Sequence, residues 1–297
     1  MKAIRIPDGF AVDIGGTKIA AARFENGLAV AQERAGTDGG ASPETLVETV
    51  SGLLERLGYR RGDRFGLATA GWIDAAGNWG AVNLNTLRKV RHVPLKSMIE
   101  EVLGPVTLVN DAAAATLAEA KVGAGRGLLN FAFLTVSTGV GGGLVLNGLL
   151  HRTADGVAGN LGFMSSTFGN VTCGSGRFGT VESAASGRAI ARMAGEAGHA
   201  GVEPRDVFEA ALAGEGWADR IVDLSAAAVA ELCGDLRAAL GLEAIAIGGS
   251  VGFARTYLSR VQKHLTSLPP LFHCPLQLAE AGPDGPMIGA LLATMEF

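Results

Sequence analysis

Two glycine-rich segments of this sequence contain the residue types that bind phosphate groups. The first is Asp13-Ile14-Gly15-Gly16-Thr17-Lys18, and the second is Ser137-Thr138-Gly139-Val140-Gly141-Gly142-Gly143. In a nucleotide site, glycine amides and the Thr17 hydroxyl can donate to phosphate oxygens, and Asp13 can hold the hydration shell of Mg²⁺. An ordinary hairpin turn explains the first segment equally well. Because the second segment lies at the same point of a second predicted hairpin, the pair favours phosphate binding.

Other motifs of nucleotide or nucleophile chemistry are missing or poorly placed. The sequence has no G-x-x-x-x-G-K-[ST], which argues against the P-loop class. Residues 174–179 match G-x-G-x-x-G, but residues 169–172 before them make a poor core strand, so a dinucleotide site is not favoured. Ser137 and Ser250 follow strands without the G-x-S-x-G elbow of a hydrolase.

Strands and helices alternate around these segments. Apolar runs and glycine turns predict a hairpin at the start of each half of the chain, followed by helices and single core strands. The predicted strands cover residues 10–14, 19–24, 65–70, 106–109, 131–137, 144–146 and 243–247, with glycine turns at 15–16, 139–143 and 248–250. The predicted helices cover residues 43–57, 94–103, 111–122, 182–240 (several helices) and 285–295. This pattern predicts a layered α/β fold in two halves with a ligand cleft between them.

The composition narrows the class of partner. The chain has 297 residues, 48% hydrophobic and 18% charged, so it can bury a sizeable core. A net charge of −4 gives no reason to expect nucleic acid or an anionic membrane as the main partner. The first residues do not form a signal peptide, so we expect a cytoplasmic protein. The uncharged stretch 128–150 is long enough to span a bilayer, but its glycines favour two buried strands.

Four segments together resemble the ROK family of sugar kinases. They are Asp13–Lys18, Asn110-Asp111, Thr135–Gly143 and Gly248-Gly249-Ser250-Val251-Gly252. The resemblance covers nearly the whole chain and is closest to bacterial members that act on N-acetylmannosamine. It implies the two-lobed actin/Hsp70/hexokinase-like ATPase fold, made of duplicated ribonuclease H-like domains with a cleft between the lobes. We expect no helix-turn-helix domain of the kind found in the family's repressors.

The resemblance also implies lobes and site residues. One lobe is expected at 1–116, completed by the helix 285–297, and the other, with the dimer contacts, at 117–284. The residues expected to bind ATP are Asp13, Gly15, Gly16, Thr17, Lys18, Thr138, Gly139, Gly141, Gly142, Gly143, Gly248, Gly249 and Ser250. The residues expected at the sugar are Gly71, Asn83, Asn110, Asp111, Asn160 and Glu182.

Asp111 matches the general base of the family, and its chemistry supports that role. Phosphoryl transfer from Mg-ATP needs the attacking hydroxyl in line with the γ-phosphate, and a carboxylate beside that hydroxyl orients it and takes its proton. The alternative is that Asp111 only caps the helix after it. A position at a helix N-terminus also predicts a low pKa for this carboxyl.

The zinc motif of the family is degenerate in this chain. Family members bind zinc through the histidine of G-E-x-G-H and three cysteines of C-x-C-G-x-x-G-C-x-E. Here Phe163, Ser175 and Thr180 replace three of these ligands, and Cys173 remains. One thiolate cannot form a closed tetrahedral site, so we expect no structural zinc. Packing of Phe168 and Phe178 is expected to hold the loop 165–179 instead, although both could line an oligomer contact.

The resemblance implies ATP-dependent phosphorylation of the 6-hydroxyl of an N-acylated hexosamine, with N-acetylmannosamine as the expected sugar in sialic acid breakdown. The expected cofactors are ATP and Mg²⁺, which enters near Asp13, and the expected assembly is a homodimer. Glucose and N-acetylglucosamine remain alternative substrates. A protein that binds sugar for regulation without turnover is the alternative of another class.

Overall fold

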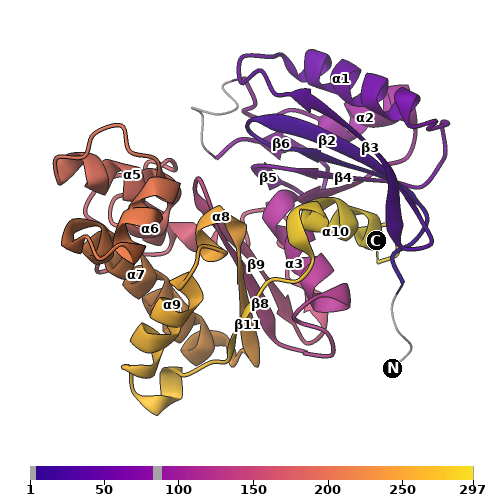
Figure 1. Ribbon diagram of the computed structural model, residues 1–297. Helices are drawn as coiled ribbons and strands as arrows, with labels where there is room; N and C mark the ends of the chain where they lie inside the picture. The colour runs from indigo at the N-terminus through magenta and orange to yellow at the C-terminus, as the bar shows by residue number, and fades with distance from the viewer. Residues whose placement is uncertain (1–4, 83–88, 297) are drawn as a thin grey trace. The chain divides into compact units, whose positions relative to one another are not determined.

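The computed structural model describes residues 5–82 and 89–296 of the chain (Figure 1). The chain divides into two compact units, and each is described here by itself. The first unit comprises residues up to 126, residues 150–158 and residues from 281 onward, and the second comprises 127–149 and 159–280. The first boundary therefore follows a complete helix, whereas the expected lobe boundary at residue 116 lies within that helix.

The first unit is built on a five-stranded sheet with the order β3-β2-β1-β4-β7. The first three strands pair antiparallel, and β4 and β7 extend the sheet in parallel with β1. The strands are β1 (Gly9–Ile14), β2 (Lys18–Glu25), β3 (Leu28–Gly36), β4 (Phe65–Thr69) and β7 (Thr107–Asn110), with a small hairpin of β5 (Trp72–Ile73) and β6 (Trp79–Gly80). Strand β3 was not predicted, because its residues are mostly exposed and lack the alternation of a half-buried strand.

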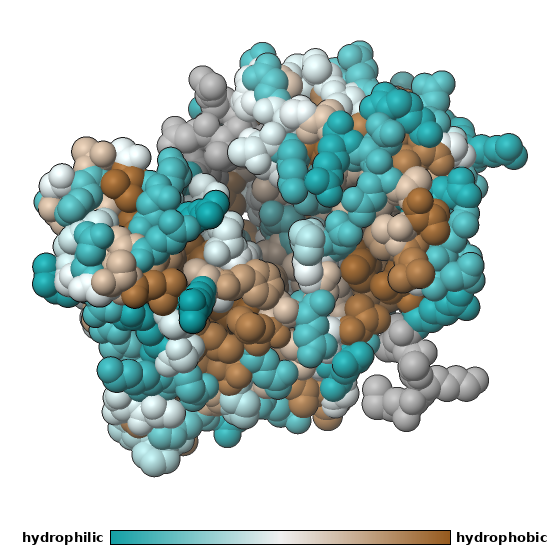
Figure 2. Space-filling model, in the orientation of Figure 1, coloured by the Kyte–Doolittle hydropathy of each residue, from teal (hydrophilic) through white to brown (hydrophobic). Residues whose placement is uncertain are grey.

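Helices cover this sheet. They are α1 (Pro43–Arg56), α2 (Leu95–Leu103), α3 (Asp111–Val122) and α10 (Gly285–Ala293). The predicted start of α1 is confirmed, because the Ser42 hydroxyl accepts a hydrogen bond from the Thr45 amide and Pro43 occupies the first turn. Over α1, the surface in Figure 2 is mostly hydrophilic, while Leu46, Val50 and Leu53 are buried beneath it.

The terminal helix α10 packs closely on α3 and on β4, although it lies far from both in sequence. Glycines make this approach possible. A Cβ atom added at Gly289 would overlap the carbonyl oxygen of Ala114 on α3, and one added at Gly66 would overlap that of Ala290. The end of the chain is therefore part of the core that supports the first residues of α3.

We expect Gly289→Ala to destabilise the protein by about 2–3 kcal/mol, because the new methyl group meets backbone that cannot rotate away. Gly52→Ala in α1 is the matched control, since its Cβ would meet only the flexible end of Arg56 at 3.7 Å. Alanine is the better helix former, so this control should equal or exceed the wild type in stability. Chemical denaturation of both variants measures the difference, and equal midpoints would contradict the close approach.

The second unit repeats the sheet of the first, with the order β10-β9-β8-β11-β12. As in the first sheet, the central strand pairs antiparallel on one side, with β9, and parallel on the other, with β11. The strands are β8 (Phe131–Val136), β9 (Val140–Leu146), β10 (Leu149–Leu150), β11 (Ala244–Gly248) and β12 (Leu276–Leu278). The two units are therefore a duplicated α/β design, as the sequence predicts.

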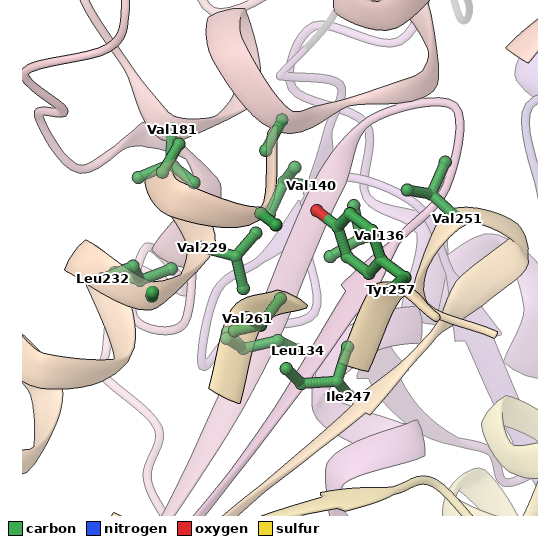
Figure 3. Packing of buried hydrophobic residues seen from close by; sticks show 14 of the residues in the cluster. Leu134, Val136, Val140, Val181, Val229, Leu232, Ile247, Val251, Tyr257 and Val261 are labelled. Carbon is green, nitrogen blue, oxygen red and sulfur yellow. The ribbon is translucent and has the colours of Figure 1, made fainter. Parts of the chain in front are cut away.

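Helices also dominate the rest of the second unit. They are α4 (Val181–Ala185), α5 (Gly187–Glu196), α6 (Pro204–Leu212), α7 (Gly216–Leu240), α8 (Gly249–Gly252) and α9 (Tyr257–Thr266), and the chain has short 3₁₀ turns η1 (Leu161–Phe163), η2 (Pro270–Phe272) and η3 (Gly282–Asp284). Figure 3 shows Leu134 on β8 and Ile247 on β11 facing Val229 of α7 and Val261 of α9, all buried.

The uncharged stretch 128–150 forms strands of the second sheet, as predicted. Among residues 5–82 and 89–296, we find no helix with the length and apolar character needed to cross a membrane.

Candidate active site

The β1–β2 hairpin gathers the first predicted phosphate segment in one tight turn. The Gly15 amide donates to the Lys18 carbonyl oxygen at 3.0 Å, and the Thr37 amide donates to the Thr17 carbonyl oxygen at 3.0 Å. The side chains of Thr17 and Lys18 are exposed at the tip of the turn. Their hydroxyl and ammonium groups are therefore available to an anionic ligand.

Two aspartates lie at one edge of the first sheet. The parallel register pairs Asp13 with Ala68 and Thr69 with Asn110, so β1, β4 and β7 end close together, and Asp111 follows β7 directly. Burial and, to a smaller extent, the charge of Asp111 raise the pKa of Asp13 to about 7, and the charge of Lys18 partly opposes this rise. Asp13 thus lies close enough to Asp111 for the charge of Asp111 to affect its ionisation.

Asp13 is suited to a hydrated cation. Its Oδ1 atom is buried and has no hydrogen-bond partner among the described residues. An unsatisfied buried carboxylate oxygen is costly, and Mg²⁺ binds carboxylate oxygens directly or through its water shell. The residue present therefore fits a magnesium ion that arrives with a nucleotide.

Asn110 and Asp111 form a hydrogen-bonded pair at the start of α3. Asn110 caps the helix, because its Oδ1 accepts from the Ala113 amide at 2.9 Å, and its Nδ2 donates to Asp111 Oδ1 at 3.0 Å. The Ala112 amide also donates to Asp111 Oδ1, at 2.8 Å. Both bonds to Asp111 end on Oδ1, so the carboxylate is oriented while Oδ2 can accept a proton. Asn110, rather than Asp111, is thus the N-cap.

The predicted low pKa of Asp111 is wrong in direction. Burial raises the pKa of this carboxyl, and the hydrogen bonds from Ala112 and Asn110 only partly oppose the rise. The position at a helix terminus is evident from the sequence, whereas the loss of solvent around Asp111 depends on the folded structure. A raised pKa suits a general base that must take up a proton near neutral pH.

Gly71 contacts this pair through its backbone. Its carbonyl oxygen accepts from Asn110 Nδ2 at 2.7 Å. Its φ of +108° and the proximity of the Gly80 carbonyl oxygen to a Cβ at this position both require glycine. Gly71 therefore helps to orient Asn110. The predicted sugar residue Asn83 lies outside the described residues.

The second phosphate turn is shorter than predicted. Val136 and Val140 are paired in the β8–β9 ladder, and the Ser137 amide donates to the Gly139 carbonyl oxygen at 2.9 Å. The turn is therefore Ser137–Gly139, and the predicted turn over 139–143 is wrong, because Gly141, Gly142 and Gly143 belong to β9. A Cβ at Gly142 would lie 2.6 Å from the Phe133 carbonyl oxygen, which explains a glycine within a strand.

The third predicted ATP segment meets this turn. Gly248 ends β11, and Gly249 and Ser250 open the short helix α8 instead of a simple turn. Gly249 has φ +85°, and a Cβ there would overlap the Val136 carbonyl oxygen. Ser250 Oγ lies 3.2 Å from Ser137 Oγ. The structure therefore brings together two segments that are more than a hundred residues apart in sequence.

A pocket of about 720 Å³ opens beside these two segments within the second unit. Its lining includes Ser137, Thr138, Arg188, Phe208, Ser250 and Arg255. The three arginines of the pocket, Arg188, Arg205 and Arg255, were not predicted, because no sequence motif contains them. The one available signal is the position of Arg188 in the first turn of a helix. The volume and the mixed polar and apolar lining suit a nucleotide.

The predicted sugar residues of the second unit lie on elements that contact β9. Asn160 precedes η1, and Glu182 is in α4. Glu182 is buried, with Oε2 accepting from the Val140 amide at 3.1 Å and Oε1 from the Gly174 amide at 3.4 Å. Glu182 thus links the start of β9 to the loop that follows η1.

The positions expected for zinc ligands partly converge. Cys173 Sγ lies 3.0 Å from Ser175 Oγ. Although burial opposes it, hydrogen bonds from Ser175 and Thr180 lower the pKa of the Cys173 thiol. Across the described part of the chain, we find no group of three or more His, Cys, Asp or Glu side chains that could hold a metal ion.

Polar contacts, not aromatic packing, organise the loop 165–179. Phe168 and Phe178 are 39% and 66% exposed, so the prediction that their packing holds the loop is wrong. Arg177 instead donates to the Phe163 carbonyl oxygen at 2.9 Å and to Ser165 Oγ at 2.7 Å. Glu231 of α7 accepts from Ser166 and Thr167 at the start of the loop.

Comparison with known proteins agrees with this arrangement. The chain is 39% identical to N-acetylmannosamine kinase of Haemophilus influenzae over 94% of this chain and 93% of that protein. It is similar to the crystal structure of a ROK hexokinase from Thermus thermophilus, with 33% identity, a TM-score of 0.81 and coverage of 98% and 99% of the two chains.

It is also similar to a ROK glucokinase from Streptomyces griseus solved with glucose and AMPPNP. That match has 27% identity and a TM-score of 0.82 and covers 98% of this chain and 100% of the other. The duplicated sheets and these neighbours confirm the expected actin-like ATPase fold with two α/β lobes. The ROK family profile matches residues 9–296, and the chain therefore belongs to the ROK family.

Proposed function

We propose that this protein is an ATP-dependent sugar kinase that phosphorylates the 6-hydroxyl of an N-acylated hexosamine, with N-acetylmannosamine as the preferred substrate. The relative from Haemophilus influenzae, which bears the name of this activity, supports the choice of sugar. The observation that carries the proposal is the Asp13–Asp111 pair at one sheet edge, in which one carboxylate suits a cation and the other suits a base.

In this proposal Asp111 is the general base. Its Oδ2 takes the proton of the 6-hydroxyl as the new oxygen–phosphorus bond forms and the bond to ADP breaks. The residues proposed to bind the sugar hydroxyls are Gly71, Asn83, Asn110, Asn160 and Glu182. The two hydrogen bonds to Asp111 Oδ1 support this role, because they hold the carboxylate in a single orientation.

The same proposal assigns the nucleotide to the glycine turns. The amides of Gly15 and Gly16 and the amides and side chains of Thr17 and Lys18 bind phosphate groups. Thr138, Gly139, Gly141, Gly142 and Gly143, together with Gly248, Gly249 and Ser250, form the other part of the ATP site. Asp13 holds Mg²⁺, which neutralises charge on the triphosphate when bound.

An ADP-release assay with four sugars tests the proposal. We expect the highest kcat/KM on N-acetylmannosamine, about tenfold or more above N-acetylglucosamine, glucose and fructose. A preference for glucose would instead favour a glucokinase. Sugar binding without turnover on any of the four would favour a regulatory protein and overturn the kinase assignment.

We further propose that the protein carries no structural zinc, because Phe163, Ser175 and Thr180 supply no thiolate or imidazole. Protein purified without a metal-affinity tag should contain far less than one zinc per chain by elemental analysis. Treatment with 1,10-phenanthroline should leave the melting temperature unchanged. A content near one zinc per chain would contradict this prediction.

We also propose a homodimer, as the family resemblance implies. Light scattering coupled to gel filtration should then give about twice the chain mass of 30.3 kDa. A mass near that of one chain would contradict it.

A further inference from the structure

Glu231, near the middle of helix α7, accepts hydrogen bonds from two consecutive residues of the loop 165–179. Its Oε2 accepts from the Ser166 hydroxyl at 2.6 Å and from the Thr167 amide at 3.0 Å. Its Oε1 accepts from the Thr167 hydroxyl at 2.6 Å. Three donors on one half-buried carboxylate form a strong, directional attachment, because hydrogen bonds to a charged acceptor are shorter and stronger than neutral ones.

The residues held by Glu231 are paired with the other end of the loop. The Ser166 amide donates to the Gly179 carbonyl oxygen at 3.0 Å, and the Val181 amide donates to the Met164 carbonyl oxygen at 2.9 Å. These bonds flank an antiparallel bridge between Ser165 and Thr180. An attachment at the start of the loop therefore also fixes its end.

The end of the loop is the start of α4, which carries Glu182. The Thr180 hydroxyl accepts from the Ser183 amide at 3.2 Å, and the Ser183 hydroxyl accepts from the Thr180 amide at 3.1 Å. These two hydrogen bonds form a capping box. Glu182 lies between these two residues in the first turn. The end of the loop therefore adjoins the residue whose carboxylate accepts from the Val140 amide.

We propose that Glu231 is a positioning residue for the sugar site, acting as an anionic anchor for the loop in which the zinc motif is degenerate. Glu231 binds Ser166 and Thr167. The backbone pairing between the two ends of the loop then holds Thr180, and the capping box that begins at Thr180 holds the first turn of α4 with Glu182. The inference rests on the proposed function in one respect, namely that Glu182 binds the sugar.

The test compares Glu231→Ala and Glu231→Gln with Asp235→Asn as the matched control. Asp235 is an exposed carboxylate one turn further along the same helix, so its variant changes the charge by the same amount. We expect Glu231→Ala to raise the KM for N-acetylmannosamine about tenfold or more, as for other residues that orient ligand-binding groups, and to leave the KM for ATP nearly unchanged. The KM of Glu231→Gln for N-acetylmannosamine should lie between those of the wild type and Glu231→Ala, because the amide oxygen of glutamine still accepts a hydrogen bond. This variant also provides the test if Glu231→Ala does not fold.

Hydrogen exchange gives a readout that does not depend on activity. Amides in 166–169 and 179–181 should exchange at least about tenfold faster in Glu231→Ala and at the wild-type rate in Asp235→Asn. Unchanged exchange in these segments would overturn the anchor. Faster exchange with equal rises in both KM values, or with a loss of kcat alone, would overturn the positioning of the sugar site. If the wild type phosphorylates none of the four sugars, the proposed function fails, and hydrogen exchange still decides whether Glu231 anchors the loop.

Discussion

Asp111→Asn should lower kcat by about 10²–10⁴-fold, the range typical of removing a general base. The asparagine keeps an oxygen that can accept from the Ala112 amide, so the start of α3 and the KM for sugar should change little. The wild-type rate should also fall at acid pH, with a midpoint above 3.8, because burial raises the pKa of Asp111 and the protonated form cannot act as a base. Steady-state kinetics between pH 5 and 9 measure both effects.

Glu44→Gln is the control for this prediction. Glu44 is an exposed acid in the first turn of α1, so the variant removes a carboxylate from a helix N-terminus that has no part in the site. It should keep the wild-type kcat. If Asp111→Asn turned over sugar as fast as this control, Asp111 would not be the base.

Asp13→Asn should abolish most kinase activity and yet raise the stability of the ligand-free protein. Burial raises the pKa of Asp13 from 3.8 to about 7, so at pH 8 the folded chain holds a buried charge with an unsatisfied oxygen. At about 1.4 kcal/mol per pKa unit, the gain has an upper limit of about 4 kcal/mol, and relaxation of the site should reduce it to about 1–3 kcal/mol.

The pH dependence follows from the sign of this shift. Between pH 3.8 and about 7 the folded protein binds a proton that the unfolded chain has released, so this group makes stability fall as pH rises. The gain from Asp13→Asn should therefore be small near pH 4 and complete above pH 7. Thermal melts across this range, without nucleotide, measure it.

The same melts with Mg-ATP separate the two effects of Asp13. Mg-ATP should raise the melting temperature of the wild type and of Asp206→Asn, an exposed control in α6, because a ligand that binds only the folded state stabilises it. Mg-ATP should raise the melting temperature of Asp13→Asn far less. An equal rise in all three proteins would show that Asp13 does not hold the cation.

Local sequence signals predicted the elements that carry the site. Three elements were predicted from signals that lie in neighbouring residues: the hairpin at residues 10–24, the capped start of α1 and the alanine-rich α3 after β7. The signals are apolar spacing, a glycine turn and an N-cap. The three elements are confirmed. The edge strand β3 escaped prediction because an exposed strand takes its stability from pairing with β2, which no local pattern records.

The glycine run after Ser137 shows a second limit. Glycines suggest a turn, but three of them are strand residues, and Gly142 is required by the close approach of the Phe133 carbonyl oxygen on the neighbouring strand. Glu231 was not predicted for the same reason, since its partner Ser166 is distant in sequence.

The order of residue types along the chain determined which groups are available for chemistry: the two glycine turns, the Asn110-Asp111 pair and a zinc motif that keeps only Cys173 of its ligands. The tertiary structure alone decided the ionisation of these groups, because their pKa values depend on the exclusion of solvent. It also decided what holds the loop, because the atoms that bind it are brought close only by folding. Asp111 illustrates the difference: its place at a helix start follows from the sequence, whereas burial against the rest of its unit reverses the expected direction of its pKa shift.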